Sequence, residues 1–445
     1  MIVIEDRRRI RAQRIAGFSL IELMVALTLG LLLSVGMVTL FGATSKTNKV
    51  SDALARLQEN GRYAVTRMTQ DLRMAGGQYC GNASGQNWIT SNNDGLVYAG
   101  MAILANANGV SNGLNGSLPD SGGLLGVLQS AGATYPLGPA DFLRGYDCTT
   151  SGCTPTVPTG SAPNGLPSGG EADGLRVRGT DVLTIRYQRG TGWNFIVGGG
   201  SPAPITLQPH VVGGQQMDDA ANFSNGDRAL ILTCGGGQIV QVNAAGTTLT
   251  PTGLENASSY QPSASVGSFD VRVFNFSKDF MTVTYYLAYK NDPDTAGRLI
   301  PTLYRRVNGS ATPDEIVQGV ERLDFLYGVQ YADASLHYLT ADEVTTNSAV
   351  AGNCSPPPPN LGLTPPATEP NCLWRSVRSI EAHLLLDTVD NITLSDADKA
   401  YRYTIDSPNM TEPPAPTADM GNGMLAGNMM RREFVALVAT RNNNH

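Results

Sequence analysis

The stretch Gly17-Phe18-Ser19-Leu20-Ile21-Glu22 opens an apolar run that continues without a charge from Leu23 to Phe41. These nineteen residues are long enough for one helix to cross a bilayer, which needs about 20. A secretory signal peptide has a shorter apolar core and ends at a small-residue cleavage site, and no A-x-A pattern follows Phe41. We therefore expect a membrane helix, and its basic leader contains Arg7, Arg8, Arg9, Arg11 and Arg14.

Glu22 is an acid at the head of this run. An ionised carboxylate in hydrocarbon costs several kcal/mol unless it is paired. A plain membrane anchor has no reason to keep such a group. We therefore expect Glu22 to have a cationic partner.

The stretch from Gly17 to Glu22 resembles the processing site of type IV pilins and pseudopilins. The resemblance implies that a prepilin peptidase cuts after Gly17 and methylates the new N-terminus, Phe18. It also implies that Glu22, the fifth residue of the mature chain, pairs with an N-terminal amine in the growing filament. A buried carboxylate becomes tolerable once it meets a cation, which makes Glu22 an assembly residue and not a catalyst.

The chain is acidic overall, and more so once the basic leader is removed. The whole chain carries 31 basic and 38 acidic side chains, and removal of residues 1–17 leaves 26 and 36, a net charge of −10. General nucleic-acid binding, which needs a basic surface, is therefore not expected.

The excess of arginines in the leader orients the apolar run with its start in the cytoplasm. We expect one inner-membrane span and a periplasmic head.

The cysteines all follow the apolar run. An even number in an exported domain favours disulfides. Spacing favours local bridges between Cys148 and Cys153 and between Cys354 and Cys372. That leaves Cys80, just beyond the helix, to join Cys234 in a sheet.

Motifs for chemistry are missing from the sequence. There is no G-x-S-x-G, P-loop or H-E-x-x-H motif, so no enzyme activity or cofactor is expected. The sequence has no C-x-x-C and its histidines are not at ligand spacing, so no metal is expected. Asp292–Gly297 resembles the start of a calcium loop, but Leu303 stands where a bidentate glutamate should be. A turn explains it better.

The helix is expected to run from Phe18 to about Ala75 and to end at Gly76-Gly77. Beyond the membrane segment its apolar positions recur at three- and four-residue steps, an amphipathic pattern that predicts packing on a head; they are Leu54, Leu57, Gly61, Ala64, Met68 and Leu72. Three glycines in the first half either let the helix bend or unwind on entering a filament, or serve close helix packing; they are Gly30, Gly36 and Gly42.

Residues 78–170 are rich in loop-forming side chains, and strand patterns follow from Asp181. The predicted strands are Asp181–Tyr187, Arg228–Leu232, Ile239–Val242, Val271–Phe276, Met281–Tyr289, Arg298–Val307, Ile316–Tyr331 (one long strand or a bent pair), Val377–Asp387 and Arg431–Thr440. A helix followed by antiparallel strands is an α+β, pilin-like fold. The expected organisation is a leader at 1–17, a helix at 18–76 with its transmembrane part at 18–41, and a β-rich head at 77–445 with long loops.

Two arginine pairs occur in predicted strands, Arg305-Arg306 and Arg431-Arg432. Because side chains alternate along a strand, one member of each pair is expected to face outward. A solvated surface or a salt bridge with a nearby acid is the default expectation, and an interface with an acidic partner is the functional alternative.

The order of strands behind the prepilin site resembles the PilW family, the large minor pilins of type IV pili. The segments that carry the resemblance are Gly226–Cys234, Leu303–Arg306, Gly319–Val329 and Arg431–Asn442. It covers the helix and the strands from Asp181 onward, while residues 85–170 and 343–372 fall outside it.

The resemblance implies a minor pilin that primes pilus assembly and supports twitching motility and adhesion. It implies as partners the prepilin peptidase, other minor pilins (PilV, PilX and FimU types), the major pilin and a PilY-type tip adhesin. Two alternatives stay open: a J-type pseudopilin of type II secretion, and a membrane-tethered adhesin or binding module whose loops recognise a surface or sugar.

Overall fold

The computed structural model describes a long helix and most strands of the head. The described residues are 19–77, 87–90, 96–99, 102–106, 134–136, 142–160, 165–199, 203–208, 211–212, 215–216, 222–233, 236–254, 272–354, 371–392, 394–405 and 411–440. The predicted leader, Gly17, Phe18, Cys80 and Cys234 lie outside them. The chain divides into two compact units, Met1–Ala55 and Arg56–His445.

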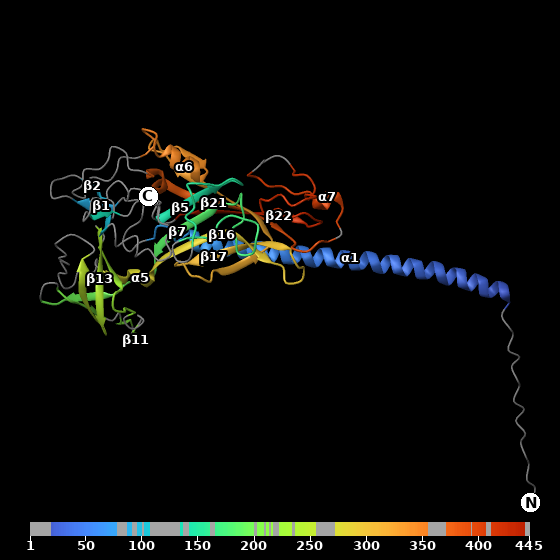
Figure 1. The fold of residues 1–445 in the computed structure, drawn as a ribbon, viewed down its shortest axis with the longest axis horizontal. Helices are drawn as coiled ribbons and strands as arrows, with labels where there is room; N and C mark the ends of the chain where they lie inside the picture. The colour runs from blue at the N-terminus through green and yellow to red at the C-terminus, as the bar shows by residue number, and fades with distance from the viewer. Residues whose placement is uncertain are drawn as a thin grey trace, which may run out of the picture. The chain divides into compact units, whose positions relative to one another are not determined.

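Helix α1 (Leu20–Leu72) is the long blue helix of Figure 1 and has 53 residues. The boundary between the two units, at Ala55 and Arg56, falls within it. Its most apolar window has a mean hydropathy of 2.3 and none of it is buried, so by length and composition the helix can cross a membrane. The helix continues past the first-half glycines, where Ser34 Oγ donates to the carbonyl of Gly30 at 2.8 Å.

The second half of α1 buries one face. Its buried apolar positions and Gly61 recur every three or four residues, as the sequence predicted, because that spacing keeps side chains on one side of a helix; they are Leu57, Gly61, Ala64, Met68 and Leu72. After the helix, Gly76 has a φ of +69°, a left-handed conformation that glycine adopts without strain.

A six-stranded antiparallel sheet, here called the central sheet, has the order β18-β17-β16-β7-β5-β6. Ten consecutive residues of β16 are buried, so both faces of this strand are covered. The predicted turn after Asn291 joins β16 to β17 as a hairpin. The strands are β5 (Leu143–Cys148), β6 (Cys153–Thr154), β7 (Val182–Gln188), β16 (Phe280–Asn291), β17 (Leu299–Val307) and β18 (Asp314–Gln318).

The C-terminal sheet has four strands in the order β20-β19-β21-β22. The segment predicted from Ile316 to Tyr331 is a bent pair, since β18 ends and β19 begins around Gly319. Gly319 has a φ of +76°, and a Cβ there would lie 2.5 Å from Asp387 Oδ1, so only glycine fits. The strands are β19 (Val320–Gln330), β20 (Leu336–Leu339), β21 (Val377–Asp387) and β22 (Arg431–Ala439).

Asp181 joins these two sheets. Its N–H donates to the carbonyl of Leu323 at 2.8 Å. Its carboxylate accepts the N–H groups of Cys148 at 2.9 Å and Phe325 at 3.0 Å. This buried residue therefore satisfies backbone groups of β5 and β19 at once.

A third sheet has eight strands and its own apolar cluster, which includes Ile205, Ala229 and Val240. Its strands are β3 (Ala102–Asn106), β4 (Thr134–Pro136), β8 (Asn194–Val197), β9 (Ile205–Gln208), β12 (Arg228–Thr233), β13 (Gly236–Ala245), β14 (Thr248–Leu254) and β15 (Arg272–Asn275). The remaining elements are the pairs β1 (Asn87–Thr90) with β2 (Leu96–Ala99) and β10 (Val211–Val212) with β11 (Gln215–Gln216), and the short helices α5 (Phe276–Asp279), α6 (Ala341–Asn347), α7 (Asp396–Lys399) and η1 (Cys372–Ser376).

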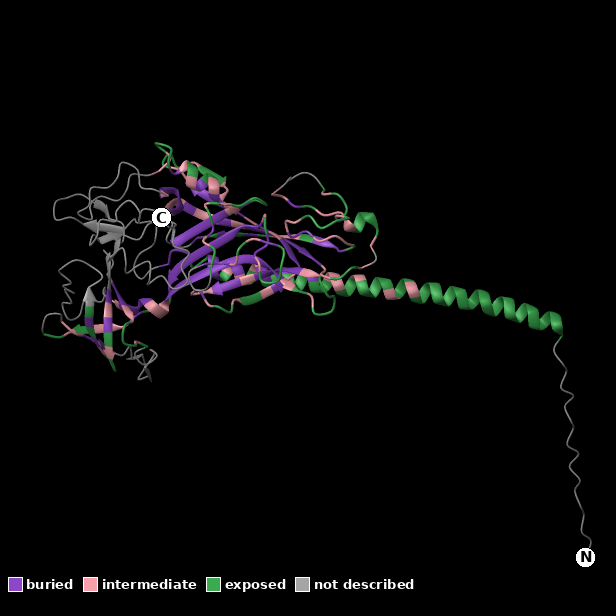
Figure 2. Ribbon diagram, viewed as in Figure 1, coloured by how far each residue is buried: buried purple, intermediate pink, exposed green. Residues whose placement is uncertain are grey.

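The predicted fold class is confirmed: an α+β chain with a long N-terminal apolar helix and large antiparallel sheets. Buried residues concentrate in the central and C-terminal sheets, and the first half of α1 is exposed (Figure 2). Strand β5 was missed, because nearly all of its residues are buried and the sequence shows no alternation there.

Close packing of α1 on β22 gives a first prediction. A Cβ on Gly61 would lie 2.3 to 2.5 Å from three atoms of the Phe434 ring. We expect Gly61→Ala to lower the free energy of unfolding by about 1–3 kcal/mol, the usual cost of overpacking, despite the better helix propensity of alanine. Chemical denaturation of the detergent-solubilised chain measures this.

The matched control is Gly42→Ala on the same helix, where a Cβ would meet nothing within 4 Å. Adding Phe434→Leu to Gly61→Ala should restore part of the loss. Equal stability of the Gly61 and Gly42 variants would show that the contact carries no strain.

Candidate assembly site

The start of α1 holds the predicted assembly residue. The backbone N–H of Ser19 donates to Glu22 Oε2 at 3.1 Å. This is one half of a capping box, and a carboxylate is also favoured at the positive end of the helix dipole. Sequence analysis missed this local partner, although serine followed three residues later by glutamate is its usual signal. The Ser19 N–H gives Glu22 Oε2 a hydrogen-bond partner, but it does not neutralise the negative charge of the carboxylate.

The surface that follows Glu22 is apolar all round. Large side chains along residues 20–41 are more than half exposed, with Leu31 at 69% and Phe41 at 79%. Among the described residues nothing covers this segment. A helix that is apolar on every side belongs in lipid or among other apolar helices.

Asp71 fastens the second half of α1 to the central sheet. Its Oδ2 accepts Arg305 Nε at 2.6 Å and the hydroxyl of Tyr285 at 2.6 Å, and its Oδ1 accepts Arg305 Nη2 at 3.3 Å. Asp71 is 4% exposed and Arg305 is 6% exposed. Asp314 at the rim makes a further ion pair with Arg305 Nη1 at 3.0 Å.

The surroundings of Asp71 and Arg305 favour the charged form of this ion pair. Burial alone would lower the pKa of Arg305, but hydrogen bonding and attraction to Asp71 outweigh it and raise that pKa above its ordinary value. Burial, followed by the negative charge of Asp71, raises the pKa of Tyr285, so its hydroxyl stays a donor. The helix–sheet contact is therefore a satisfied ionic network in an apolar surround.

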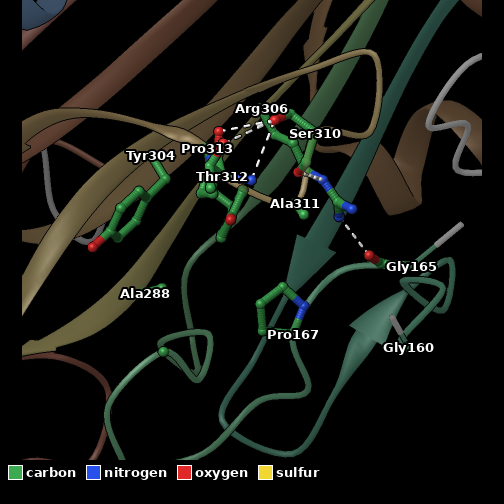
Figure 3. A pocket seen from close by; sticks show the side chains of 12 residues that line it. Gly160, Gly165, Pro167, Ala288, Tyr304, Arg306, Ser310, Ala311, Thr312 and Pro313 are labelled. Atoms are coloured by element: carbon green, nitrogen blue, oxygen red, sulfur yellow. Dashed lines mark hydrogen bonds between the residues drawn. The ribbon is translucent and has the colours of Figure 1, made fainter. Parts of the chain in front are cut away.

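Arg306, the next residue, is also buried and lines a cavity of about 480 Å³ (Figure 3). Its guanidinium donates to the carbonyls of Gly165, Gly309 and Ser310. Burial lowers its pKa. The stacked rings of Tyr286 and Tyr304, 5.9 Å apart, also line the cavity.

The expectation of one outward-facing arginine in each pair is wrong for Arg305-Arg306, since both side chains are buried. In the second pair Arg432 is exposed and Arg431 is buried. Arg431 Nε lies 2.5 Å from Glu321 Oε2, and Arg431 Nη2 lies 2.7 Å from Oε1. Where both faces of a strand are covered, as at this part of β17, side chains on either face are buried and the alternation between core and solvent is lost.

Two disulfides join the locally spaced cysteines, Cys148 with Cys153 and Cys354 with Cys372. The first closes the β5–β6 hairpin, and the second links the ends of the proline-rich segment. The predicted Cys80–Cys234 pair lies outside the described residues.

Asp292 serves the turn before β17. Its Oδ1 accepts the N–H of Asp294 at 2.8 Å, and its Oδ2 pairs with Arg298 Nη1 at 3.1 Å. Throughout the described part of the chain, no group of three or more His, Cys, Asp or Glu side chains is placed to hold a metal ion.

Comparison with known families gives two matches. Residues 13–38 match the prokaryotic N-terminal methylation motif, and residues 284–442 match the family described as type IV pilus-assembly protein W, or PilW. No curated protein and no solved structure gives a significant match.

The methylation motif and the apolar helix support membrane anchoring and association with pili, and they define the chain as a prepilin-like component of type IV pilus assembly. The PilW match covers β17 to β22 and most of β16, including Arg305, Glu321 and Arg431. Together the two matches support a type IV minor pilin of the PilW family. This family is a structural assembly component and not a known enzyme family.

The Asp71–Arg305 contact gives a second prediction. Replacing Asp71 by Asn leaves a buried guanidinium without its main counter-charge. We expect the free energy of unfolding to fall by about 3–5 kcal/mol, as when one partner of a buried pair is removed. Denaturant titration of the full chain in detergent measures it.

Asp314→Asn is the matched control, because this side chain contacts the same arginine but is 60% exposed. Its loss should cost less than about 1 kcal/mol. If the two variants were equally stable, burial of the Asp71 pair would not be what holds the helix to the sheet.

Proposed function

We propose that this chain is made as a prepilin and acts as a minor pilin in priming type IV pilus assembly. The observation that carries the proposal is the coincidence of a methylation-motif match over residues 13–38 with a PilW match over residues 284–442. The all-round apolar start of α1 and the single carboxylate at its head support it.

Processing would occur between Gly17 and Phe18, with methylation of the new amine. The chain would then consist of a helix at 18–76 and a head at 77–445, after loss of the leader 1–17. Residues 18–41 would cross the inner membrane once, with the head in the periplasm until the subunit enters a filament. The window of mean hydropathy 2.3 supports the span, and the basic leader supports its orientation.

Glu22 would pair with the N-terminal amine of a neighbouring subunit. Capping by the Ser19 N–H holds the carboxylate at the end of the helix, where its remaining acceptor positions stay open to a second donor. A neighbour's ammonium would neutralise the charge at the moment when the helix leaves lipid for a bundle of helices. A buried ion pair of this kind favours register more than stability.

The head would contribute surfaces for partners. Because Asp71 and Tyr285 tie the second half of α1 to the central sheet, a force on that part of the helix reaches the sheet directly. We propose other minor pilins of the PilV, PilX and FimU types, the major pilin and a PilY-type tip adhesin as partners, in support of twitching motility and adhesion. No catalytic role is proposed.

Glu22 variants test the mechanism. We expect Glu22→Ala and Glu22→Gln both to be processed normally but to enter pili and minor-pilin complexes several-fold less than the wild type. Glutamine keeps an oxygen that can accept the Ser19 N–H and loses only the charge, so it separates capping from ion pairing. Mass spectrometry of the N-terminus and quantitative immunoblotting of sheared pili provide the measurements.

Normal piliation and complex formation by the Gln variant would contradict the ion-pair role and leave helix capping as the function of Glu22. A mature N-terminus other than Phe18 would overturn the processing step. Loss of protein secretion, with pili intact, on deletion of the chain would favour a type II secretion pseudopilin instead.

A further inference from the structure

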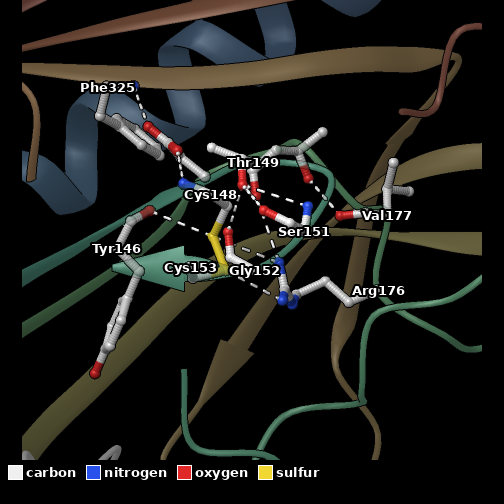
Figure 4. Close-up of a disulfide and its surroundings, with 11 residues drawn as sticks. Tyr146, Cys148, Thr149, Ser151, Gly152, Cys153, Arg176, Val177 and Phe325 are labelled. Carbon is white, nitrogen blue, oxygen red and sulfur yellow. Dashed lines mark hydrogen bonds between the residues drawn. A yellow bond between two sulfur atoms is a disulfide. The ribbon is translucent and has the colours of Figure 1, made fainter. Parts of the chain in front are cut away.

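The guanidinium of Arg176 points at the Cys148–Cys153 disulfide (Figure 4). Arg176 Nη1 lies 3.6 Å from Cys148 Sγ, and Arg176 Nη2 lies 3.3 Å from Cys153 Sγ. Arg176 is 6% exposed, and its Nε has no hydrogen-bond partner among the described residues. A disulfide sulfur is only a weak acceptor, so these contacts satisfy the cation poorly.

A full counter-charge for Arg176 is lacking in the oxidised form. Within the described chain, no carboxylate lies at ion-pair distance from it, and Nη1 otherwise reaches only the carbonyl of Thr180 at 3.5 Å. Asp181 is the acid that acts on it electrostatically. Burial, followed by the charge of the neighbouring Asp324, raises the pKa of Asp181 well above its ordinary value.

We propose that Cys148–Cys153 is a thiol-exchange site whose reduced form is stabilised by Arg176. A cysteine thiolate supplies the negative charge that the buried guanidinium lacks, and a neighbouring cation lowers the pKa of a thiol. The fold thus favours the reduced pair more than an ordinary structural disulfide would. The partner is a thiol, either a small molecule or a dithiol oxidoreductase. This inference does not rest on the proposed pilus function.

The exchange proceeds in two steps. An external thiolate attacks Cys153 Sγ, because Cys153 is half-buried whereas Cys148 is 6% exposed. A mixed disulfide with Cys153 forms, the Cys148–Cys153 bond breaks, and Cys148 leaves as a thiolate beside Arg176 Nη1. A second external thiolate then attacks the external sulfur, releasing Cys153 as a thiolate and the external thiol as its disulfide. Two electrons pass from the external thiols to the protein pair.

The β5–β6 hairpin has backbone contacts besides the disulfide. The N–H of Thr149 donates to the carbonyl of Gly152 at 2.7 Å, and Asp147 pairs with Thr154 across β5 and β6. We therefore expect reduction to leave the central sheet folded.

Equilibration in glutathione buffers tests the proposal. The full chain in detergent is equilibrated at several ratios of reduced to oxidised glutathione, trapped by alkylation, and scored at each cysteine pair by peptide mass spectrometry. We expect Arg176→Gln to make Cys148–Cys153 about tenfold harder to reduce, which corresponds to about 30 mV. Arg176→Lys should stay closer to the wild type. The Cys354–Cys372 pair in the same sample should not respond.

An unchanged equilibrium in Arg176→Gln would overturn the proposal. Should that variant fail to fold, the pH dependence of iodoacetamide alkylation in the reduced wild-type chain decides. We expect the Cys148 and Cys153 thiols to titrate below the ordinary value of about 8.5 and below those of the Cys354–Cys372 pair. Thiol pKa values for Cys148 and Cys153 at or above those of the Cys354–Cys372 pair would contradict the proposal.

Discussion

The buried contact between Asp71 and Arg305 is the constraint on which the arrangement of helix and head depends. Two charges taken from water lose several kcal/mol of hydration each, and they recover it only when every hydrogen bond is made in good geometry. Here Arg305 Nε and the Tyr285 hydroxyl meet the same carboxylate oxygen. Sliding α1 by one residue would break both bonds, so the contact sets the register of the helix on the central sheet.

The C-terminal sheet repeats this design. Glu321 and Arg431 are each almost fully buried and bond through two atom pairs. The same side chains hold the loop before β22, since Glu321 Oε1 accepts the N–H of Leu425 and Arg431 donates to its carbonyl. Apolar burial drives the association of the layers, and these polar contacts specify how the layers meet.

The two units of the chain face different surroundings. In residues 23–41 every side of the helix is apolar, so the segment needs lipid or other helices. From Leu57 to Leu72 the apolar side chains keep to one face and are buried on the sheets. One continuous helix thus joins a segment suited to a membrane or filament interior to a folded head.

The local sequence pattern was sufficient to predict the long apolar helix, its amphipathic second half and most strands from Asp181 onward. It was also sufficient to identify the family resemblance. These features repeat with the period of a helix or strand, and neighbouring residues encode that period. The Ser19–Glu22 cap was equally local and could have been predicted.

The partners of the buried charges depended on the tertiary structure. Asp71 and Arg305 are 234 residues apart, and nothing near either one indicates the other. The same holds for Arg176 and its disulfide, because the cysteine spacing predicts the bridge but not the cation beside it. Sequence alone was sufficient for the long apolar helix and for most of the strands from Asp181 onward. Only the packed layers decided which charges are buried together, because burial and partner choice arise from contacts between distant segments.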